Sequence, residues 1–174
     1  MDGQRFPADV SIRAIRPDDV GPLERFYAAL STDSLDARFH GGTHGIEDRA
    51  ATRFCGPDHV HREGLLAIAR SRDGAEESIV GHLCLEPAGA DDVEMAIAVA
   101  DAWQHHGIGH ALLDAAIDWA GRHGFARVRG AIRWSNPAIL RLVRACGRPV
   151  TVVTDAEGDT EAVIDIRGRG RAAA

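Results

Sequence analysis

The stretch that decides the fold reads EMAIAVADAWQHHGIGHALL and covers residues 94–113. Its start belongs to a short, mostly apolar run at 93–99, which predicts a buried strand. Residues 107–123 predict an amphipathic helix, because apolar side chains recur on one face of that segment. The members of this face are Ile108, Leu112, Ala116 and Trp119. A strand, a short loop and a helix are therefore expected to follow one another here.

The loop between this strand and helix, QHHGIG at 104–109, has the features of an anion-binding site. The first backbone amides of a helix lack internal partners, and the helix dipole is positive there. Glycine also lets the backbone approach a phosphate closely. Two glycines equally suit a dinucleotide-binding fold or a purely structural turn. The loop lacks, however, the third glycine of the Rossmann fingerprint and the lysine of a P-loop.

The rest of the chain predicts an α+β fold around this stretch. Strands are expected at 10–16, 65–70, 79–85, 126–133, 150–154 and 162–166, and helices at 17–30, 34–39, 47–54 and 136–147. With no internal repeat or linker, residues 1–174 are predicted to form a single domain whose ordered core covers about 10–166. The tail at 167–174 alternates glycine and arginine and is expected to be disordered.

Composition excludes several classes of protein. The 174 residues are 45% hydrophobic, which suits the core of one domain, and the net charge of −6 argues against a nucleic-acid binder that relies on bulk positive charge. We find neither an apolar signal core nor a membrane span of roughly 20 apolar residues, so a cytoplasmic protein without membrane contact is predicted. The 20 basic residues are all arginine, so the chain offers no lysine side chain for self-modification. Cys55, Cys84 and Cys146 are irregularly spaced and predict neither disulfides nor a metal cluster.

The loop resembles the acetyl-CoA loop of the GNAT family of N-acetyltransferases, written Q/R-x-x-G-x-G/A. Its context is similar too: a strand, the loop, a helix, a strand, and a helix that starts with asparagine. The resemblance extends over residues 10–147 and is most specific over 93–147. It implies the GNAT fold, which is a central, mostly antiparallel mixed sheet of six to seven strands flanked by helices. It also implies acetyl-CoA as the co-substrate and transfer of its acetyl group to an amine.

Further segments are similar to one branch of this family, the bacterial protein lysine acetyltransferases that act on acyl-CoA synthetases. IRAIRPDD and LSTDSLDARF are similar to the IRPIRPED and LSPES…RF of that branch, and residues 96–104 are similar to its FAVVVADAWQ. This likeness implies a protein lysine as the acceptor. A small-molecule amine acetyltransferase and a non-catalytic acetyl-CoA sensor remain alternatives. The protein is expected to be a monomer or a homodimer.

Glu94 is the candidate general base. A lysine amine has a pKa of about 10.4, so at neutral pH a proton must leave it as it attacks. Glu94 is the acid within VEMAIAV, and in the similar branch a glutamate at this point serves as the base. The alternative is a solvent-facing strand residue with no catalytic part, because alternate residues of a strand point to opposite faces.

A longer set of residues is predicted to bind acetyl-CoA. The resemblance to GNAT folds implies a β-bulge that frees the backbone of Ile97, Ala98 and Val99 for the pantetheine arm and the oxyanion. The pyrophosphate should lie against the amides of Gln104, His105, His106, Gly107, Ile108, Gly109 and His110. The following helix adds Ile139, Arg144 and Asn136, which corresponds to an asparagine that contacts the cofactor in many members of the similar family. Asn136 also suits a plain helix N-cap, and Arg141 or Arg144 could pair with the 3′-phosphate or simply lie on the surface.

In one respect the chain departs from the family pattern. Many members have a tyrosine seven residues after the asparagine, as the acid for the CoA thiolate, and this chain has Val143 there. A thiol with a pKa near about 8.5 can leave as thiolate without full protonation. The acid therefore stays unassigned, with Ser135, Cys146 and water as candidates.

Histidine clusters at 40–44 and 59–61 raise the question of a metal site. We expect no metal, because no cysteine or carboxylate lies at ligand spacing beside them. They are predicted to be solvated loop residues that help to shape the acceptor side.

Overall fold

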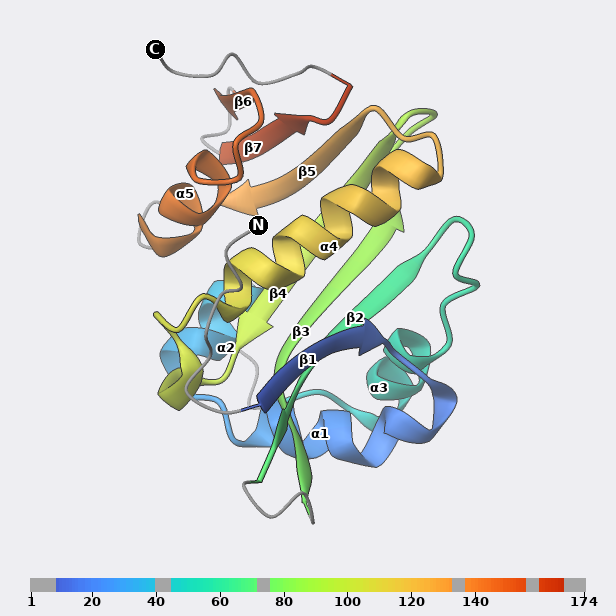
Figure 1. Ribbon diagram of the computed structural model, residues 1–174, viewed down its shortest axis with the longest axis vertical. Helices are drawn as coiled ribbons and strands as arrows, with labels where there is room; N and C mark the ends of the chain where they lie inside the picture. The colour runs from blue at the N-terminus through green and yellow to red at the C-terminus, as the bar shows by residue number, and fades with distance from the viewer. Residues whose placement is uncertain (1–8, 40–44, 72–75, 133–136, 156–159, 168–174) are drawn as a thin grey trace.

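Seven strands in one sheet form the centre of the computed structural model, which describes residues 9–39, 45–71, 76–132, 137–155 and 160–167 (Figure 1). The strands are β1 (Asp9–Ala14), β2 (Glu63–Arg70), β3 (Glu77–Pro87), β4 (Asp92–Val99), β5 (Arg127–Ile132), β6 (Val150–Thr154) and β7 (Thr160–Asp165). The helices are α1 (Val20–Ala28), α2 (Thr32–Phe39), α3 (Asp48–Cys55), α4 (Ile108–Arg122) and α5 (Pro137–Arg144), with the 3-10 turns η1 (Pro17–Asp19) and η2 (Asp101–Trp103). The predicted α+β class is confirmed.

The sheet is mixed, with the strand order β1-β2-β3-β4-β5-β7-β6. β1 to β4 form an antiparallel meander, and β5, β7 and β6 form a second antiparallel set. β4 and β5 pair in parallel, and α4 joins them. A parallel pair needs such a crossover connection, usually a helix. The mostly antiparallel mixed sheet expected from the sequence is thereby confirmed.

Helices cover the two faces of the sheet, each over its own apolar core. On one face α4 crosses the strands (Figure 1) and buries Ile108, Leu112 and Leu113. On the other face α1 packs on β3, and its Leu23 and Tyr27 have no exposed surface. Each leucine buried in this way contributes roughly 1.5–3 kcal/mol. On that second face α2 packs on β4, so β4 lies between helices from both layers.

Gly81 on β3 allows the first turns of α4 to approach the sheet closely. A Cβ at this position would lie 2.9 Å from Leu112 Cδ1 and 3.2 Å from Ile108 Cγ2. Both side chains are fully buried, and close-packed interiors leave little room to move aside. The glycine therefore sets the height of α4, and of the loop before it, above the sheet.

β4 and β5 diverge after three residue pairs. Their register joins Asp92, Val93 and Glu94 to residues 127–129, and residues 95–99 have no β5 partner among the described residues. The β-bulge expected at 97–99 is wrong, because β3 and β4 keep an unbroken register along this stretch. The bulge lies between β2 and β3, at 67–68. Divergence from β5, and not a bulge, frees the edge of β4.

The predicted elements are all present, with differences at their ends. α5 ends at Arg144 and not at Gly147, which follows the helix with a φ of +69°. The turns predicted at 72–74 and 157–159 lie outside the described residues. Cys55, Cys84 and Cys146 are free thiols. None of the helices described here is long and apolar enough to cross a membrane.

Candidate active site

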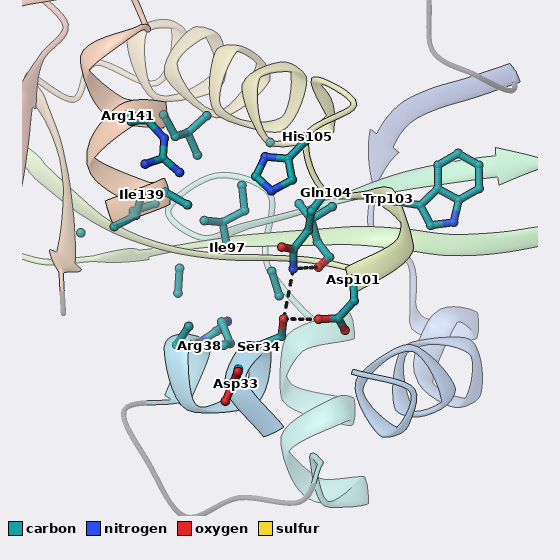
Figure 2. A pocket seen from close by; sticks show the side chains of 18 of the residues that line it. Asp33, Ser34, Arg38, Ile97, Asp101, Trp103, Gln104, His105, Ile139 and Arg141 are labelled. Carbon is teal, nitrogen blue, oxygen red and sulfur yellow. Dashed lines mark hydrogen bonds between the residues drawn. The ribbon is translucent and has the colours of Figure 1, made fainter. Parts of the chain in front are cut away.

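A cavity of about 1410 Å³ opens beside the free edge of β4. Its walls come from β4, α2, the loop before α4, and the first turns of α5 (Figure 2). Many predicted site residues line it together: Glu94, Ile97, Ala98, Val99, Gln104, His105, His106, Gly107, Gly109, His110 and Ile139. The diverging strands thus create a single space that adjoins both the candidate base and the candidate phosphate loop.

Two residues predicted to bind the cofactor are placed differently, and a third is not described. Ile108 is 1% exposed and packs in the core under α4, which leaves its backbone as the part available to a ligand. Arg144 does not line the cavity, whereas Arg141, about one helical turn earlier, does. Asn136 lies outside the described residues.

The candidates for the general acid are not on the described cavity wall. Val143 has no exposed surface and belongs to the core between α5 and the sheet. Cys146 packs at the edge of that core and does not line the cavity. Ser135 and the histidines within 40–44 lie outside the described residues.

The loop before α4 turns at two left-handed positions. His105 has a φ of +63° and Gly107 a φ of +82°. Glycine adopts this conformation freely, while for other residues it costs roughly 1–2 kcal/mol. Gly107 is the N-cap of α4 and lines the cavity. Left-handed turns leading into a helix start form the concave arrays of amides that bind anions.

The candidate base, Glu94, is exposed on the cavity wall. Its neighbours Val93 and Met95 point into the core under α4, so its carboxylate projects from the α2 face of the sheet. Its cross-strand partners are Glu86 on β3 and Arg129 on β5. Within the described part of the chain, the Glu94 carboxylate has no hydrogen-bond or ion-pair partner, so it is available to a proton donor in the cavity.

Arg38 on α2 is a cavity residue that the sequence pattern did not single out. Its guanidinium lies 4.7 Å from the ring centre of Phe39 and 5.5 Å from that of Phe54. Its Nη2 donates to Cys84 Sγ at 3.2 Å. Cys84 on β3 lies opposite Ala96 on β4. Ala96 is two residues after Glu94, so Cys84 and Glu94 lie on the same face of the sheet. The sequence feature that could have indicated Arg38 is the Arg38-Phe39 dipeptide at the end of LSTDSLDARF, the segment similar to the lysine acetyltransferase branch.

Beneath this wall lies a buried polar pair, Tyr27 and His82. The Tyr27 hydroxyl is 2.8 Å from His82 Nδ1, and neither side chain is exposed. Burial, helped by the charge of Arg38, lowers the pKa of His82 to about 3, so the ring is neutral at physiological pH. Burial also raises the pKa of Tyr27 to about 12. The chain's single tyrosine is therefore a structural residue of the α1 layer, without access to the cavity.

The histidines at 59–61 lie next to carboxylates, contrary to the sequence expectation. His59 Nδ1 is 2.7 Å from Glu63 Oε1, and His61 Nδ1 is 3.2 Å from Asp58 Oδ2. Over the described residues, histidine, cysteine and acidic side chains form no group of three or more that could hold a metal. His59 and Glu63 border a second, smaller cavity near the end of α4 and not the one beside β4.

Comparison with known proteins identifies the family. Residues 27–147 match the Acetyltransferase (GNAT) family. The chain therefore belongs to the GNAT acetyltransferases, and acetyl-CoA is its co-substrate. None of the curated proteins matches the sequence.

Solved structures share this fold at low sequence identity. The GNAT domain of PAT from S. lividans is 24% identical, with a TM-score of 0.78 and 90% of each chain covered. The protein yncA from Salmonella typhimurium, solved with its cofactor acetyl-CoA, is 18% identical, with a TM-score of 0.70 over 96% of this chain and 99% of that one. Spermidine N-acetyltransferase from Vibrio cholerae, in complex with CoA and spermine, is 13% identical, with a TM-score of 0.66 over 88% and 93%.

Proposed function

We propose that the chain transfers the acetyl group of acetyl-CoA to the side-chain amine of a protein lysine, with Glu94 as the general base. The observation that carries the proposal is the position of Glu94. Its exposed carboxylate stands on the cavity wall at the point where β5 leaves β4. A base at this point is next to the backbone edge along which an extended cofactor arm could lie.

The cofactor fits the remaining walls of the cavity. The amides of the loop at 104–110 are suited to the pyrophosphate, because they combine left-handed turns with the start of α4. The free edge at 97–99 offers backbone partners to the pantetheine amides and to the oxyanion. Ile139 supplies an apolar contact, and Arg141 is placed to meet a phosphate.

The proposed reaction is a direct attack. The lysine nitrogen bonds to the acetyl carbonyl carbon while Glu94, directly or through a water, accepts the proton that the amine loses. The carbon–sulfur bond then breaks, and CoA leaves as a thiolate that takes a proton from solvent. No side-chain acid is needed for that step, since a thiol has a pKa near about 8.5.

Two features favour a cationic, protein-borne acceptor. Asp33, Asp36 and Glu94 line the cavity and attract a protonated amine. Beside Glu94, the β5 residues Arg127 and Arg129 are partly exposed and form ion pairs with neighbouring carboxylates, which gives a charged surface suited to a protein partner. The likeness of LSTDSLDARF to the lysine acetyltransferase branch agrees with this choice. A polyamine is the second candidate, because the same acidic wall suits it and a spermidine acetyltransferase shares the fold.

Measurement of CoA release tests the proposal. Lysine-containing peptides should release CoA from acetyl-CoA, and the same peptides with arginine in place of lysine should not. Because all 20 basic residues of the chain are arginine, a lysine-directed label cannot arise from self-acetylation. Turnover with spermidine but not with peptides would favour the second candidate. Absence of turnover with every amine, despite acetyl-CoA binding, would support a sensor.

A further inference from the structure

The start of α2 is joined to the segment before α4 by hydrogen bonds that neither the base nor the phosphate loop requires. The Asp101 carboxylate accepts from Ser31 N at 2.9 Å, from Ser31 Oγ at 2.6 Å and from Ser34 Oγ at 2.8 Å. Gln104 Nε2 donates to Ser34 Oγ at 3.1 Å and to the Val99 carbonyl at 3.2 Å. Figure 2 shows Gln104, Ser34 and Asp101 converging at the cavity wall.

The directions of these hydrogen bonds are mutually consistent. Ser34 Oγ donates its proton to Asp101 and accepts from Gln104, so its donor and one acceptor position are both used. Asp101 belongs to η2, but its carboxylate lies beside the N-terminus of α2, where free amides and the helix dipole favour a negative charge. Burial acts to raise the pKa of Asp101, but the hydrogen bonds from Ser31 and Ser34 outweigh it and hold the pKa below its usual value.

α2 depends on these polar contacts because its apolar anchoring is small. Leu35 is the one fully buried residue of its eight, and Phe39 at the end of the helix packs half-buried against the same core. A helix this short is not stable by itself and must be held by its surroundings. α2 also carries Asp33 and Arg38 into the cavity. These α2 residues form the acceptor wall, which is the side of the cavity assigned to the amine under the proposed function. Its position therefore depends on the contacts with Asp101 and Gln104.

Gln104 stands at the other end of this connection, directly before the left-handed residue His105. Its side chain points to α2, although its backbone belongs to the phosphate loop. Any ligand that orders the loop will therefore order Gln104, and through Ser34 it will order the start of α2. Such coupling is reciprocal, so an ordered α2 also favours the binding-competent loop.

We propose that Ser31, Ser34, Asp101 and Gln104 form a latch through which acetyl-CoA, on binding to the loop, holds α2 and its acceptor-wall residues in place. The four are positioning residues, which act through α2 and not on the reacting atoms. The proposal of a latch depends on the proposed function in one respect only, namely that the acceptor amine binds at the acceptor wall. The ordering of α2 by acetyl-CoA is a separate property that needs no acceptor to be observed.

Hydrogen exchange of the intact protein, with and without saturating acetyl-CoA, tests the latch. In the wild type, acetyl-CoA should slow exchange of the amides in 32–39 by about fivefold or more, together with those in 107–111. In Ser34→Ala and Gln104→Ala, the slowing at 32–39 should fall below about twofold while 107–111 stay protected. Gln104→Ala keeps the Asp101 contacts that cap α2, so it gives a folded comparison if Ser34→Ala is unstable. Thr32→Ala, an exposed substitution in the same turn, should behave as the wild type.

The outcomes separate the latch from the catalytic proposal. Protection at 107–111 without protection at 32–39 in the wild type would overturn the latch and leave acetyl-CoA binding intact. Equal protection of 32–39 in the wild type and in both latch variants would overturn it as well. With an active acceptor, the variants should raise KM for the amine about tenfold and weaken acetyl-CoA binding by no more than about fivefold, which is the size of the coupling that they remove. General destabilisation would not produce this split.

Discussion

The carboxylate of Glu94 lies on the cavity wall and, within the described part of the chain, makes no hydrogen bond or ion pair, which suits a group that must accept a proton. Glu94→Gln keeps the size of the side chain but removes its basicity. We expect the turnover number to fall by about 10²–10⁴-fold, with acetyl-CoA affinity unchanged. The loss should shrink at high pH, since more of the amine is then already neutral. Steady-state kinetics from about pH 7 to about pH 10 measure both effects.

Glu86 provides the control for that variant. It is the cross-strand neighbour of Glu94 but lies off the cavity wall and pairs with Arg62 at 3.0 Å. Glu86→Gln should retain turnover within about threefold, because a carboxylate outside the cavity makes no contact that strengthens in the transition state. Wild-type turnover in Glu94→Gln, or a loss caused wholly by weaker acetyl-CoA binding, would count against Glu94 as the base.

Two glycines of the loop should respond differently to substitution. Gly107 has a φ of +82° and lines the cavity, so Gly107→Asp adds backbone strain and a negative charge where phosphate must approach. Gly109 lies in the first turn of α4, and a Cβ there meets Leu142 at an ordinary 3.5 Å. Acetyl-CoA at about 100 times its Kd should stabilise the wild type and Gly109→Ala by about 2.7 kcal/mol, and Gly107→Asp not at all. The shift in Tm with acetyl-CoA measures this, and an equal shift in Gly107→Asp would place the cofactor elsewhere.

At the scale of the elements, the packing of α4 on β3 sets the height above the sheet of the loop at 104–109. Gly81→Ala would bring a Cβ to 2.9 Å from Leu112 Cδ1, and we expect it to destabilise the fold by about 1–3 kcal/mol, as overpacking does. At Gly121, within α4, an added Cβ would have no atom within 4 Å, so Gly121→Ala should stabilise by about 0.5–1 kcal/mol through helix propensity. Urea unfolding of both variants measures these opposite signs. A stabilising Gly81→Ala would show that α4 can shift on the sheet.

At the scale of the whole molecule, one buried histidine should shape the dependence of stability on pH. The pKa of His82 falls from 6.5 in the unfolded chain to about 3 when folded, because burial and then the charge of Arg38 disfavour its protonated form. Between these values the unfolded chain binds a proton that the folded chain excludes. His82 therefore lowers the free energy of unfolding as the pH falls below about 6.5, by about 2 kcal/mol between pH 7 and pH 5.

A variant without this histidine isolates its contribution. In His82→Gln, the difference in unfolding free energy between pH 7 and pH 5 should be smaller than in the wild type by about 2 kcal/mol. His106→Gln, at an exposed position, should retain the wild-type difference. Urea titrations at both pH values provide the measurement. If His82→Gln loses as much stability on acidification as the wild type, the acid sensitivity belongs to other groups.

The sequence by itself determined the order of the elements and the glycine-containing loop before α4. Apolar periodicity predicted β4 and α4 closely, because the pattern of buried positions is a local property of each segment. The loop at 104–109 was also readable, since a helix start with adjacent glycine has unpaired amides wherever it lies in the fold. Glu94 was selected from the same stretch, but strand alternation left its face open, and only the structure places it on the cavity wall.

Only the tertiary structure decided how distant segments meet. The divergence of β5 from β4 replaced the predicted bulge, because strand pairing depends on how α4 and the later strands pack and not on residues 97–99 alone. The contact of Ser34 with Asp101 joins residues 67 positions apart, and the burial of His82 beneath α1 is likewise non-local. Periodicity states which face of an element is buried, but not which side chains of another element lie against it. For that physical reason only the packed fold brings Ser34 to Asp101 and α2 to the cavity beside β4, while the loop at 104–109 could be predicted from the sequence.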